Sequence, residues 1–139
     1  MSFNLKQGNI QRFNTYTHSS TTPLKLTTEN SGSFIFLDCS ANNLTIELPP
    51  NENSIGIHFD FLVTNVSNGN TIDIKAVDKA GDPESEKIQI TGNFTPGHTA
   101  TLEIGIDEFN GDRLQIISNG SKWYLNNFVS NNTLSRDNS

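Results

Sequence analysis

Between Leu24 and Phe128 the sequence consists of short segments in which apolar and polar residues alternate, separated by Gly, Asn, Ser and Pro. Alternation with a period of two is typical of β-strands with one buried face, because successive side chains of a strand point to opposite sides. Apolar residues at the helical spacing i, i+3, i+4, i+7 do not persist anywhere for three turns. The sequence therefore predicts an all-β protein with no helix of consequence.

Nine segments are candidate strands, and their turns suggest how they pair. We expect the first three to form a meander, because each is followed by a short turn or by proline. The fourth and fifth are expected to form a hairpin across Ser-Asn-Gly-Asn. The last two are expected to form another at Asn119-Gly120, a pair that supplies the positive φ angles of a type I′ turn. The nine candidates are residues 24–28, 34–39, 44–48, 57–66, 72–76, 88–90, 102–106, 114–116 and 123–125.

Eight or nine antiparallel strands with short and long connections fit a single jelly-roll-like β-sandwich, and a closed barrel is the second choice. We expect this domain to cover residues 23–130. The long connections, including 49–56, would lie at the ends of the sandwich, where recognition residues often lie. Residues 1–22 are predicted to form an extended N-terminal arm, or else a flexible end with one short strand. Residues 131–139 are predicted to form a polar, disordered C-terminal tail.

The composition indicates a thin core and a weakly charged surface. Hydrophobic residues make up 33% of the 139 residues, and charged residues only 17%, where a typical soluble domain has about 25%. A thin core gives a marginal fold, and burial between subunits is one remedy. We therefore expect an oligomer.

Charge and hydropathy argue against several partners. The formal net charge is −6, and the nine Lys and Arg are scattered, so neither nucleic acid nor an anionic membrane is an expected partner. No run approaches 18 apolar residues, and residues 1–10 lack the features of a cleaved signal peptide. Cys39 is the only cysteine, so an intrachain disulfide is excluded, and we expect its thiol to be buried.

Catalytic and metal-binding groupings are weak in this sequence. His58 and Asp60 share one side of a predicted strand and could act as an acid/base pair, but a solvated polar face is far commoner. His18 and His98 are expected at the surface. The acidic segments 78–86 and 107–112 could hold Ca²⁺, yet neither has the spacing of an EF-hand loop. We therefore expect no enzyme, no metal and no cofactor.

Aromatic residues are the best candidates for an interface. Trp123 and Tyr124 are adjacent and point to opposite sides of a strand, so we place Trp123 in the core and Tyr124 in an interface or on the surface. Phe109 lies in a predicted loop, where it either anchors a partner or folds inward. The arm adds three further candidate anchors, which are Phe3, Phe13 and Tyr16.

Several stretches together resemble a known class of virion protein. They are LTTENSG at 26–32, FIFLD at 34–38, LTIELP at 44–49, Gly56 with FDF at 59–61, and SNGSKWY at 118–124. The pattern resembles small β-modules of tailed phages, which include capsid decoration or cement proteins and parts of head and tail fibres. These stretches are turn and core residues, so no binding residue can be carried over. The polar residues before Pro23 have no counterpart in the pattern.

The resemblance implies a structural protein of the virion. Many such modules are trimeric, and the absence of long fibre repeats favours decoration over a fibre. We therefore expect a homotrimer, made in the host cytoplasm, that binds the major capsid protein on the outer surface of the capsid and stabilises the shell. The alternative is a glycan-binding or receptor-binding module of a phage fibre, in which the end loops and Tyr124 contact sugar.

Overall fold

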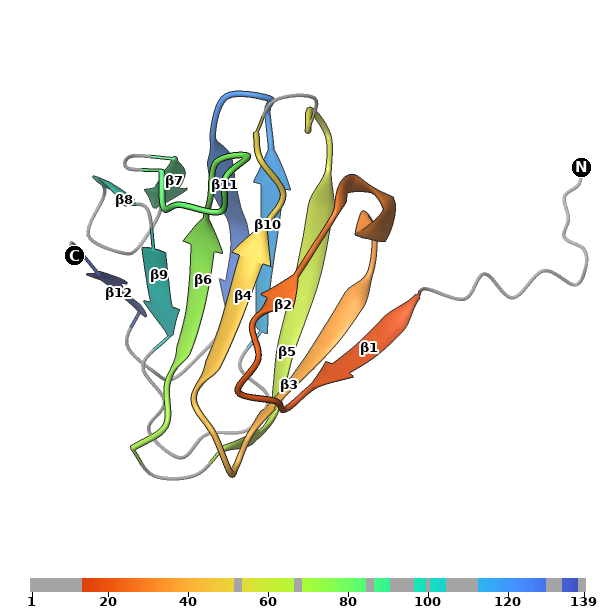
Figure 1. The fold of residues 1–139 in the computed structure, drawn as a ribbon, viewed down its shortest axis with the longest axis vertical. Helices are drawn as coiled ribbons and strands as arrows, with labels where there is room; N and C mark the ends of the chain where they lie inside the picture. Colours follow the sequence, from red (N-terminus) through yellow and green to blue (C-terminus); the bar gives the residue numbers. More distant parts are fainter. Residues whose placement is uncertain are drawn as a thin grey trace, which may run out of the picture.

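The computed structural model contains twelve strands in two sheets, and one 3₁₀ turn at Thr28–Asn30 is the only helical segment among the described residues (Figure 1). The all-β prediction is therefore confirmed. The described residues are 14–51, 54–66, 69–84, 87–90, 97–99, 101–104, 113–129 and 134–137. The strands are β1 (Thr15–His18), β2 (Leu24–Lys25), β3 (Phe34–Cys39), β4 (Leu44–Leu48), β5 (His58–Val66), β6 (Ile72–Ala76), β7 (Ile88–Ile90), β8 (Gly97–Thr99), β9 (Thr101–Ile104), β10 (Arg113–Ser118), β11 (Trp123–Val129) and β12 (Leu134–Asp137).

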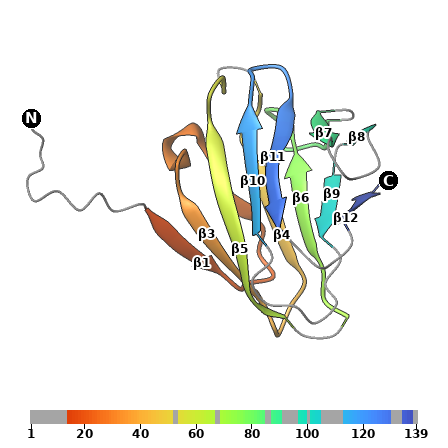
Figure 2. The ribbon, with the colours of Figure 1, turned by 180° about the vertical axis from the view of Figure 1, so that it is seen from behind.

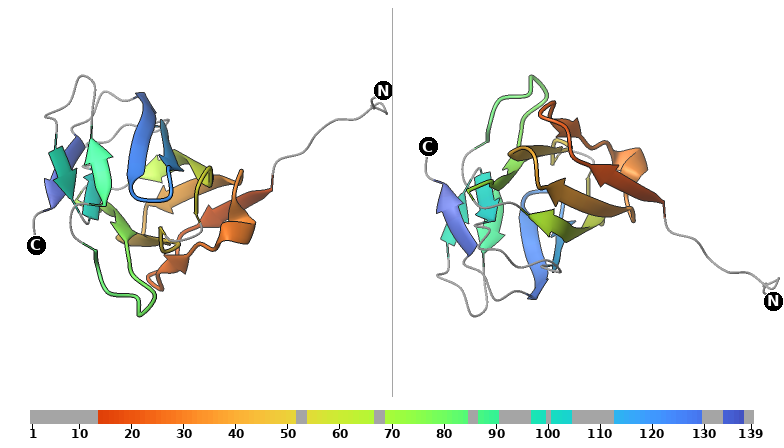
Figure 3. Two further views of the ribbon diagram at one scale, coloured as in Figure 1. Left: turned by 90° about the horizontal axis from the view of Figure 1, so that it is seen from above. Right: turned by 90° about the horizontal axis from the view of Figure 1, so that it is seen from below.

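In the first half of the chain, consecutive strands alternate between the two sheets. The seven-stranded sheet has the order β1-β3-β5-β10-β11-β7-β8, and the five-stranded sheet has the order β12-β9-β6-β4-β2. Strands β1, β3 and β5 are parallel neighbours in the first sheet, as are β2, β4 and β6 in the second. The chain thus winds as a coil that gives one strand to each sheet per turn, as the views along the strands show (Figure 3).

This coil contradicts part of the predicted pairing. The strands at 34–39, 44–48 and 72–76 have the predicted bounds. However, the predicted meander and the predicted β5–β6 hairpin are wrong, because the partners lie in different sheets. A hairpin and a connection that crosses between sheets both join two alternating segments through a short polar turn, so the pattern along one chain does not separate them.

Asparagine side chains join successive turns of the coil in the loops that lead from the seven-stranded sheet to the five-stranded sheet. Asn42 donates from Nδ2 to the carbonyl oxygen of Ser19 at 3.0 Å, and Asn70 donates from Nδ2 to that of Cys39 at 2.6 Å. The amide of Thr71 donates to Oδ1 of Asn43. Each turn is therefore tied to the turn before it, which satisfies polar groups that the strand ladders do not use.

The strands of the second half of the chain cover one end of the coil, and most of their ladders are antiparallel, although β7 and β11 pair in parallel. β10 pairs with β5 and β11, and β9 pairs with β6, all antiparallel. The predicted β10–β11 hairpin is confirmed, with Gly120 at φ 90°. Oδ1 of Asn119 closes this turn by accepting from the amides of Ser121 and Lys122. The antiparallel prediction thus holds for these pairs. It fails for the ladders among β1 to β6 and for the ladder between β7 and β11, which are parallel.

The inward side chains of both sheets form one hydrophobic cluster. Strand β3 alternates buried and partly exposed residues along its length, as do β4 and β6. Trp123 is fully buried with its ring 5.9 Å from that of Phe59, and Cys39 is also buried, so both predictions are confirmed. The cluster is made up of Leu26, Ile35, Leu37, Cys39, Leu44, Ile46, Leu48, Phe59, Phe61, Val63, Ile72, Ile74, Ala76, Ile88, Leu114, Ile116, Trp123 and Leu125.

The two chain ends differ from the boundaries expected from the sequence. The predicted arm, 1–22, contains β1, which joins the seven-stranded sheet through its ladder with β3. This agrees with the alternative of one short strand in that segment. The predicted tail, 131–139, contains β12, which pairs with β9. Its expected disorder is therefore not seen at residues 134–137.

His18 is buried, and the prediction that it lies at the surface is wrong. It pairs with Leu37 in the parallel ladder and has 7% of its surface exposed, while the other three residues of β1 are exposed. Burial lowers the pKa of His18, and a hydrogen bond with the main chain of Thr45 opposes this effect. A neutral imidazole therefore fixes β1 to the rest of the structure.

We predict that His18 makes the free energy of unfolding depend on pH. A histidine in the unfolded chain titrates near pH 6.5, and below this pH the unfolded chain binds a proton that the folded His18 resists. Stability should therefore fall as pH drops from about 7.5 to about 5.5, where carboxylates are still ionised. Urea unfolding at both pH values measures this, with His18→Met as the matched variant. An equal pH dependence in both proteins would contradict the prediction.

Candidate interface surface

The outward face of the five-stranded sheet is polar and charged. Lys25, Glu47 and Lys75 lie side by side in register on β2, β4 and β6. Thr45 and Asp73 form a second outward pair beside them. Opposite charges on neighbouring strands attract one another and remain well hydrated, so this face is suited to solvent. In Figure 1 this sheet lies toward the viewer.

The outward face of the seven-stranded sheet has an apolar area on β3 and β5. Phe34 and Phe36 point outward from β3 with ring centroids 5.5 Å apart, and Leu62 of β5 is the register partner of Phe36. All three side chains are partly exposed. We call these three residues the outer apolar patch. Figure 2 shows the sheet from this side.

An arginine lies across the outer apolar patch. Cζ of Arg113 is 5.4 Å from the centre of the Phe34 ring, and its Nη2 is 3.9 Å from Oδ1 of Asp60. The Asp60 side chain is only 15% exposed, and its Oδ1 has no hydrogen bond within the described part of the chain. Because a buried acceptor without a donor is costly, a partner that brings a donor here would gain binding energy.

These features are typical of a protein–protein interface. Aromatic side chains and arginine are enriched at the centres of interfaces, where they contribute most of the binding energy. Thr15 and Thr17 of β1 and Gln115 of β10 lie around the patch on the same face. An apolar centre within a polar rim therefore occupies one face of the protein, while the other face is charged.

Two of the five predicted interface residues, Tyr16 and Tyr124, lie in the part of the chain that the structure describes. Tyr16 is 42% exposed on β1, and its hydroxyl accepts a hydrogen bond from Nδ2 of Asn30. Tyr124 is partly exposed on β11, with its hydroxyl 3.4 Å from Nδ2 of Asn119. In the register of β10 and β11, Tyr124 lies beside Ile117, on the same face as the outer apolar patch. Phe3, Phe13 and Phe109 lie outside the described residues.

The outer apolar patch was missed from the sequence, although a signal for it exists. In Phe34–Cys39 the first four residues are all apolar, and Leu62 interrupts the polar side of β5. A strand that is apolar on both sides is typical of one covered on both faces. Alternation alone accounts only for the side of each strand that faces the core.

The candidate catalytic residues lie on one strand, and the first candidate metal-binding segment begins in the loop after β6. His58 and Asp60 are both on the outward face of β5, and the ion pair of Asp60 is with Arg113. No group of three or more metal-ligating side chains occurs among the described residues. In the acidic segment 78–86, Oδ1 of Asp78 accepts from the amides of Ala80 and Asp82, which explains this aspartate as a turn residue. Residues 107–112 lie outside the described ranges.

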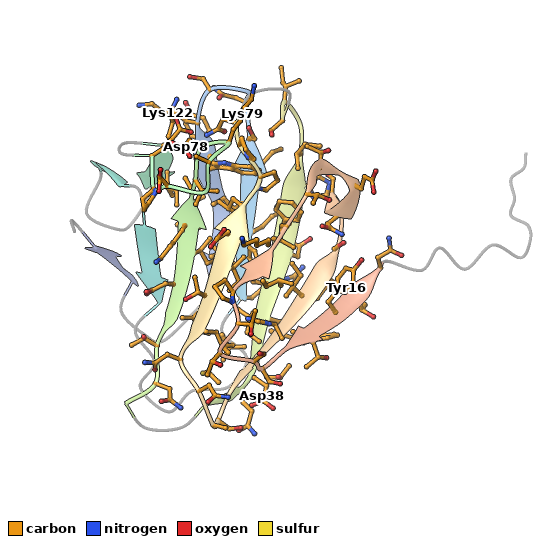
Figure 4. The ribbon with its side chains drawn as sticks, viewed as in Figure 1. Tyr16, Asp38, Asp78, Lys79 and Lys122 are labelled. Carbon is orange, nitrogen blue, oxygen red and sulfur yellow. The ribbon has the colours of Figure 1, made fainter. Side chains whose placement is uncertain are left out.

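A shallow depression lies between β2, β4 and the loop that follows β6. Its volume is about 210 Å³, and Lys25, Glu47, Asp78 and Lys79 lie among its lining residues. Figure 4 labels Asp78 and Lys79 in the loop that follows β6, and Lys122 is close to them in that view. Pockets for small molecules usually have about 300–1,000 Å³. This depression is therefore a weaker candidate site than the outer apolar patch.

The comparisons with known proteins leave the surface as the basis for the function. No protein-family model matches the chain, and no curated protein matches it in sequence. Over the ranges that the structure describes, no helix is long and apolar enough to cross a membrane. Function is therefore inferred from the two outward faces and from the edges of the sheets.

We predict that the two phenylalanines on opposite faces differ in their effect on stability. Phe59→Ala removes a fully buried ring and should lower the free energy of unfolding by about 3–5 kcal/mol. Phe36→Ala removes an outward, partly exposed ring and should cost less than half as much. Urea unfolding of both variants measures the difference. Equal losses would mean that Phe36 is packed as tightly as the core.

Proposed function

We propose that this protein is a structural virion protein that decorates the outer surface of a tailed-phage capsid by binding the major capsid protein. The outer apolar patch, crossed by Arg113, is the observation that carries the proposal. It is supported by the resemblance of the turn and core residues to phage virion modules. In this role the protein binds to the shell and catalyses no reaction.

The contrast between the two faces supports a flat mode of attachment. The seven-stranded sheet offers Phe34, Phe36 and Leu62, whereas the five-stranded sheet offers the row Lys25, Glu47 and Lys75. We infer that the two sheets form a β-sandwich that lies with the first face on the shell and the second in solvent. The protein would then be located on the capsid exterior.

Stabilisation of the shell follows from mass action. A protein that binds the assembled shell, and not its separate subunits, shifts the equilibrium toward the assembled state. Each bound copy would also bury apolar surface of the patch that is otherwise in contact with water. Resistance of the capsid to heat or denaturant should therefore increase with occupancy.

We predict that a charge in the patch abolishes capsid binding. Phe36→Asp should lose binding, because a carboxylate buried in an apolar interface without a partner is strongly unfavourable. The assay is co-sedimentation with empty capsids assembled from the major capsid protein encoded alongside this chain. Ile55→Asp is the matched control, since it also replaces an apolar side chain by a carboxylate, at a position that is 76% exposed in the loop before β5.

Two results would overturn the proposed function. The first is that the unaltered protein stays in the supernatant when such capsids sediment. The second is that Phe36→Asp still sediments with capsids as well as Ile55→Asp does, while circular dichroism shows both variants folded.

We also propose that the residues before β1 contribute to attachment, as the sequence analysis expected of Phe3 and Phe13. Deletion of residues 2–13 leaves both Asn14 and β1 intact. It therefore keeps the hydrogen bond from the amide of Phe34 to the carbonyl of Asn14. We predict that the truncated protein keeps its thermal unfolding temperature but binds capsids more weakly. Undiminished co-sedimentation would exclude a role for this segment. A deletion through residue 22 would not be informative, because it would remove β1.

A further inference from the structure

Within the described residues, the main-chain groups on the outer edge of β1 have no partner. Among the described strands, β1 is the last of the seven-stranded sheet (Figure 1). The carbonyl of Asn14 accepts from the amide of Phe34 at 2.8 Å, so the main-chain groups of Asn14, Tyr16 and His18 point toward β3. Because these groups alternate along a strand, the N–H and C=O groups of Thr15 and Thr17 point away from the sheet.

Within the part of the chain that the structure describes, this edge lacks the protection that the corresponding edge of the other sheet has. The outermost strand beside β4 is β2, which has only two residues, follows Pro23 and carries Lys25. Short length, proline and lysine are the usual means by which proteins keep a sheet edge from pairing. β1 is longer, uncharged above the pKa of histidine, and free of proline and of register shifts. The difference indicates that the β1 edge is used.

We propose that β1 pairs antiparallel with β1 of a second copy of this protein. The register follows from the groups that point outward, because Thr15 of each copy must lie opposite Thr17 of the other. The N–H and C=O groups of both threonines then find partners in both copies. Tyr16 lies opposite Tyr16 of the second copy, at the twofold axis.

The residues at the junction favour a second copy as the occupant. Each copy has a net charge of −6, so close approach requires an uncharged contact, and the side chains of Thr15, Tyr16 and Thr17 supply one. Tyr16 is 42% exposed and gains an aromatic neighbour across the strands. Its hydroxyl contact with Asn30 fixes the ring at the edge, where Figure 4 labels it.

The pairing changes how the outer apolar patch is presented. A twofold axis perpendicular to the sheet places both seven-stranded sheets in one continuous sheet, with both patches on the same side. Two patches on one rigid body bind a repeating shell more tightly than one. The pairing rests on the proposed function and extends it, because a dimer would attach to the shell at two points. A dimer of this kind would take the place of the trimer that the resemblance implies.

The contact between two four-residue strands is small, so the dimer should be weak in solution. Stable interfaces bury about 1,200–2,000 Å² in total. A covalent trap at the axis is therefore the appropriate test. Residues opposite each other in a pair that is not hydrogen-bonded have Cα atoms about 4.5 Å apart, which is within the range of a disulfide.

The experiment uses Tyr16→Cys in the full-length protein, without capsids. Mild oxidation should convert most of it to a disulfide-linked dimer on a non-reducing gel, because the native Cys39 is buried and cannot react. Ile55→Cys is the control, since Ile55 is 76% exposed in a loop away from β1. The Ile55→Cys protein should remain monomeric under the same oxidation. A Tyr16→Cys protein that links no better than Ile55→Cys would overturn the proposal.

A second pair of variants tests the main-chain groups themselves. In the Tyr16→Cys protein, Thr17→Pro removes the outward N–H and should abolish cross-linking, whereas Thr17→Ala keeps this N–H and should retain it. Should Thr17→Pro not fold, Thr15→Lys combined with Thr17→Lys places like charges opposite one another and should also abolish the dimer. Cross-linking that persists in these variants, or a trimer in native mass spectrometry of the unaltered protein, would refute the pairing. The cross-linking experiments contain no capsids, so a negative result would refute the β1 pairing without bearing on capsid binding.

Discussion

The structure depends on strands that find their hydrogen-bonding partners one full turn of the coil away. A strand such as β4 must place Leu44, Ile46 and Leu48 against the opposite sheet while its main chain pairs with β2 and β6. Both requirements are met only when successive turns stack in register, because a shift by one residue would turn the apolar side chains outward. The asparagines in the loops from the seven-stranded to the five-stranded sheet maintain that register.

The coil has two different ends, and this difference organises the surface. At one end, the antiparallel strands β9 and β10 pair with β6 and β5 and so cover the edges of the last turn. At the other end, β1 and β2 are the outermost described strands of their sheets. An edge position has its main-chain groups unsatisfied unless water or a partner supplies hydrogen bonds. The interaction surfaces proposed for this protein therefore lie at the open end and on the face beside it.

Local pattern predicted the strands well, and it failed where pairing depends on distant residues. Phe34–Cys39 and Ile72–Ala76 could be located from alternation alone. Whether the turn after β3 returned within one sheet or crossed to the other depended on β1 and β5, which are far along the chain. His18 was misplaced for the same reason, since its pairing with Leu37 and its hydrogen bond with the main chain of Thr45 involve residues outside its own segment. The outer apolar patch could have been found from the run of apolar residues in β3, but its neighbour Arg113 required the register with β5.

The repetition of the coil has a consequence for aggregation. Detachment of β1 would uncover the edge of β3, a longer strand that begins with four consecutive apolar residues, Phe34 to Leu37. An exposed apolar edge of this kind recruits further strands from neighbouring molecules. Occupancy of the β1 edge, as proposed above, would therefore also help to keep the isolated protein dispersed, since it holds β1 over the edge of β3. Capsid attachment and colloidal stability would then be linked through one short strand.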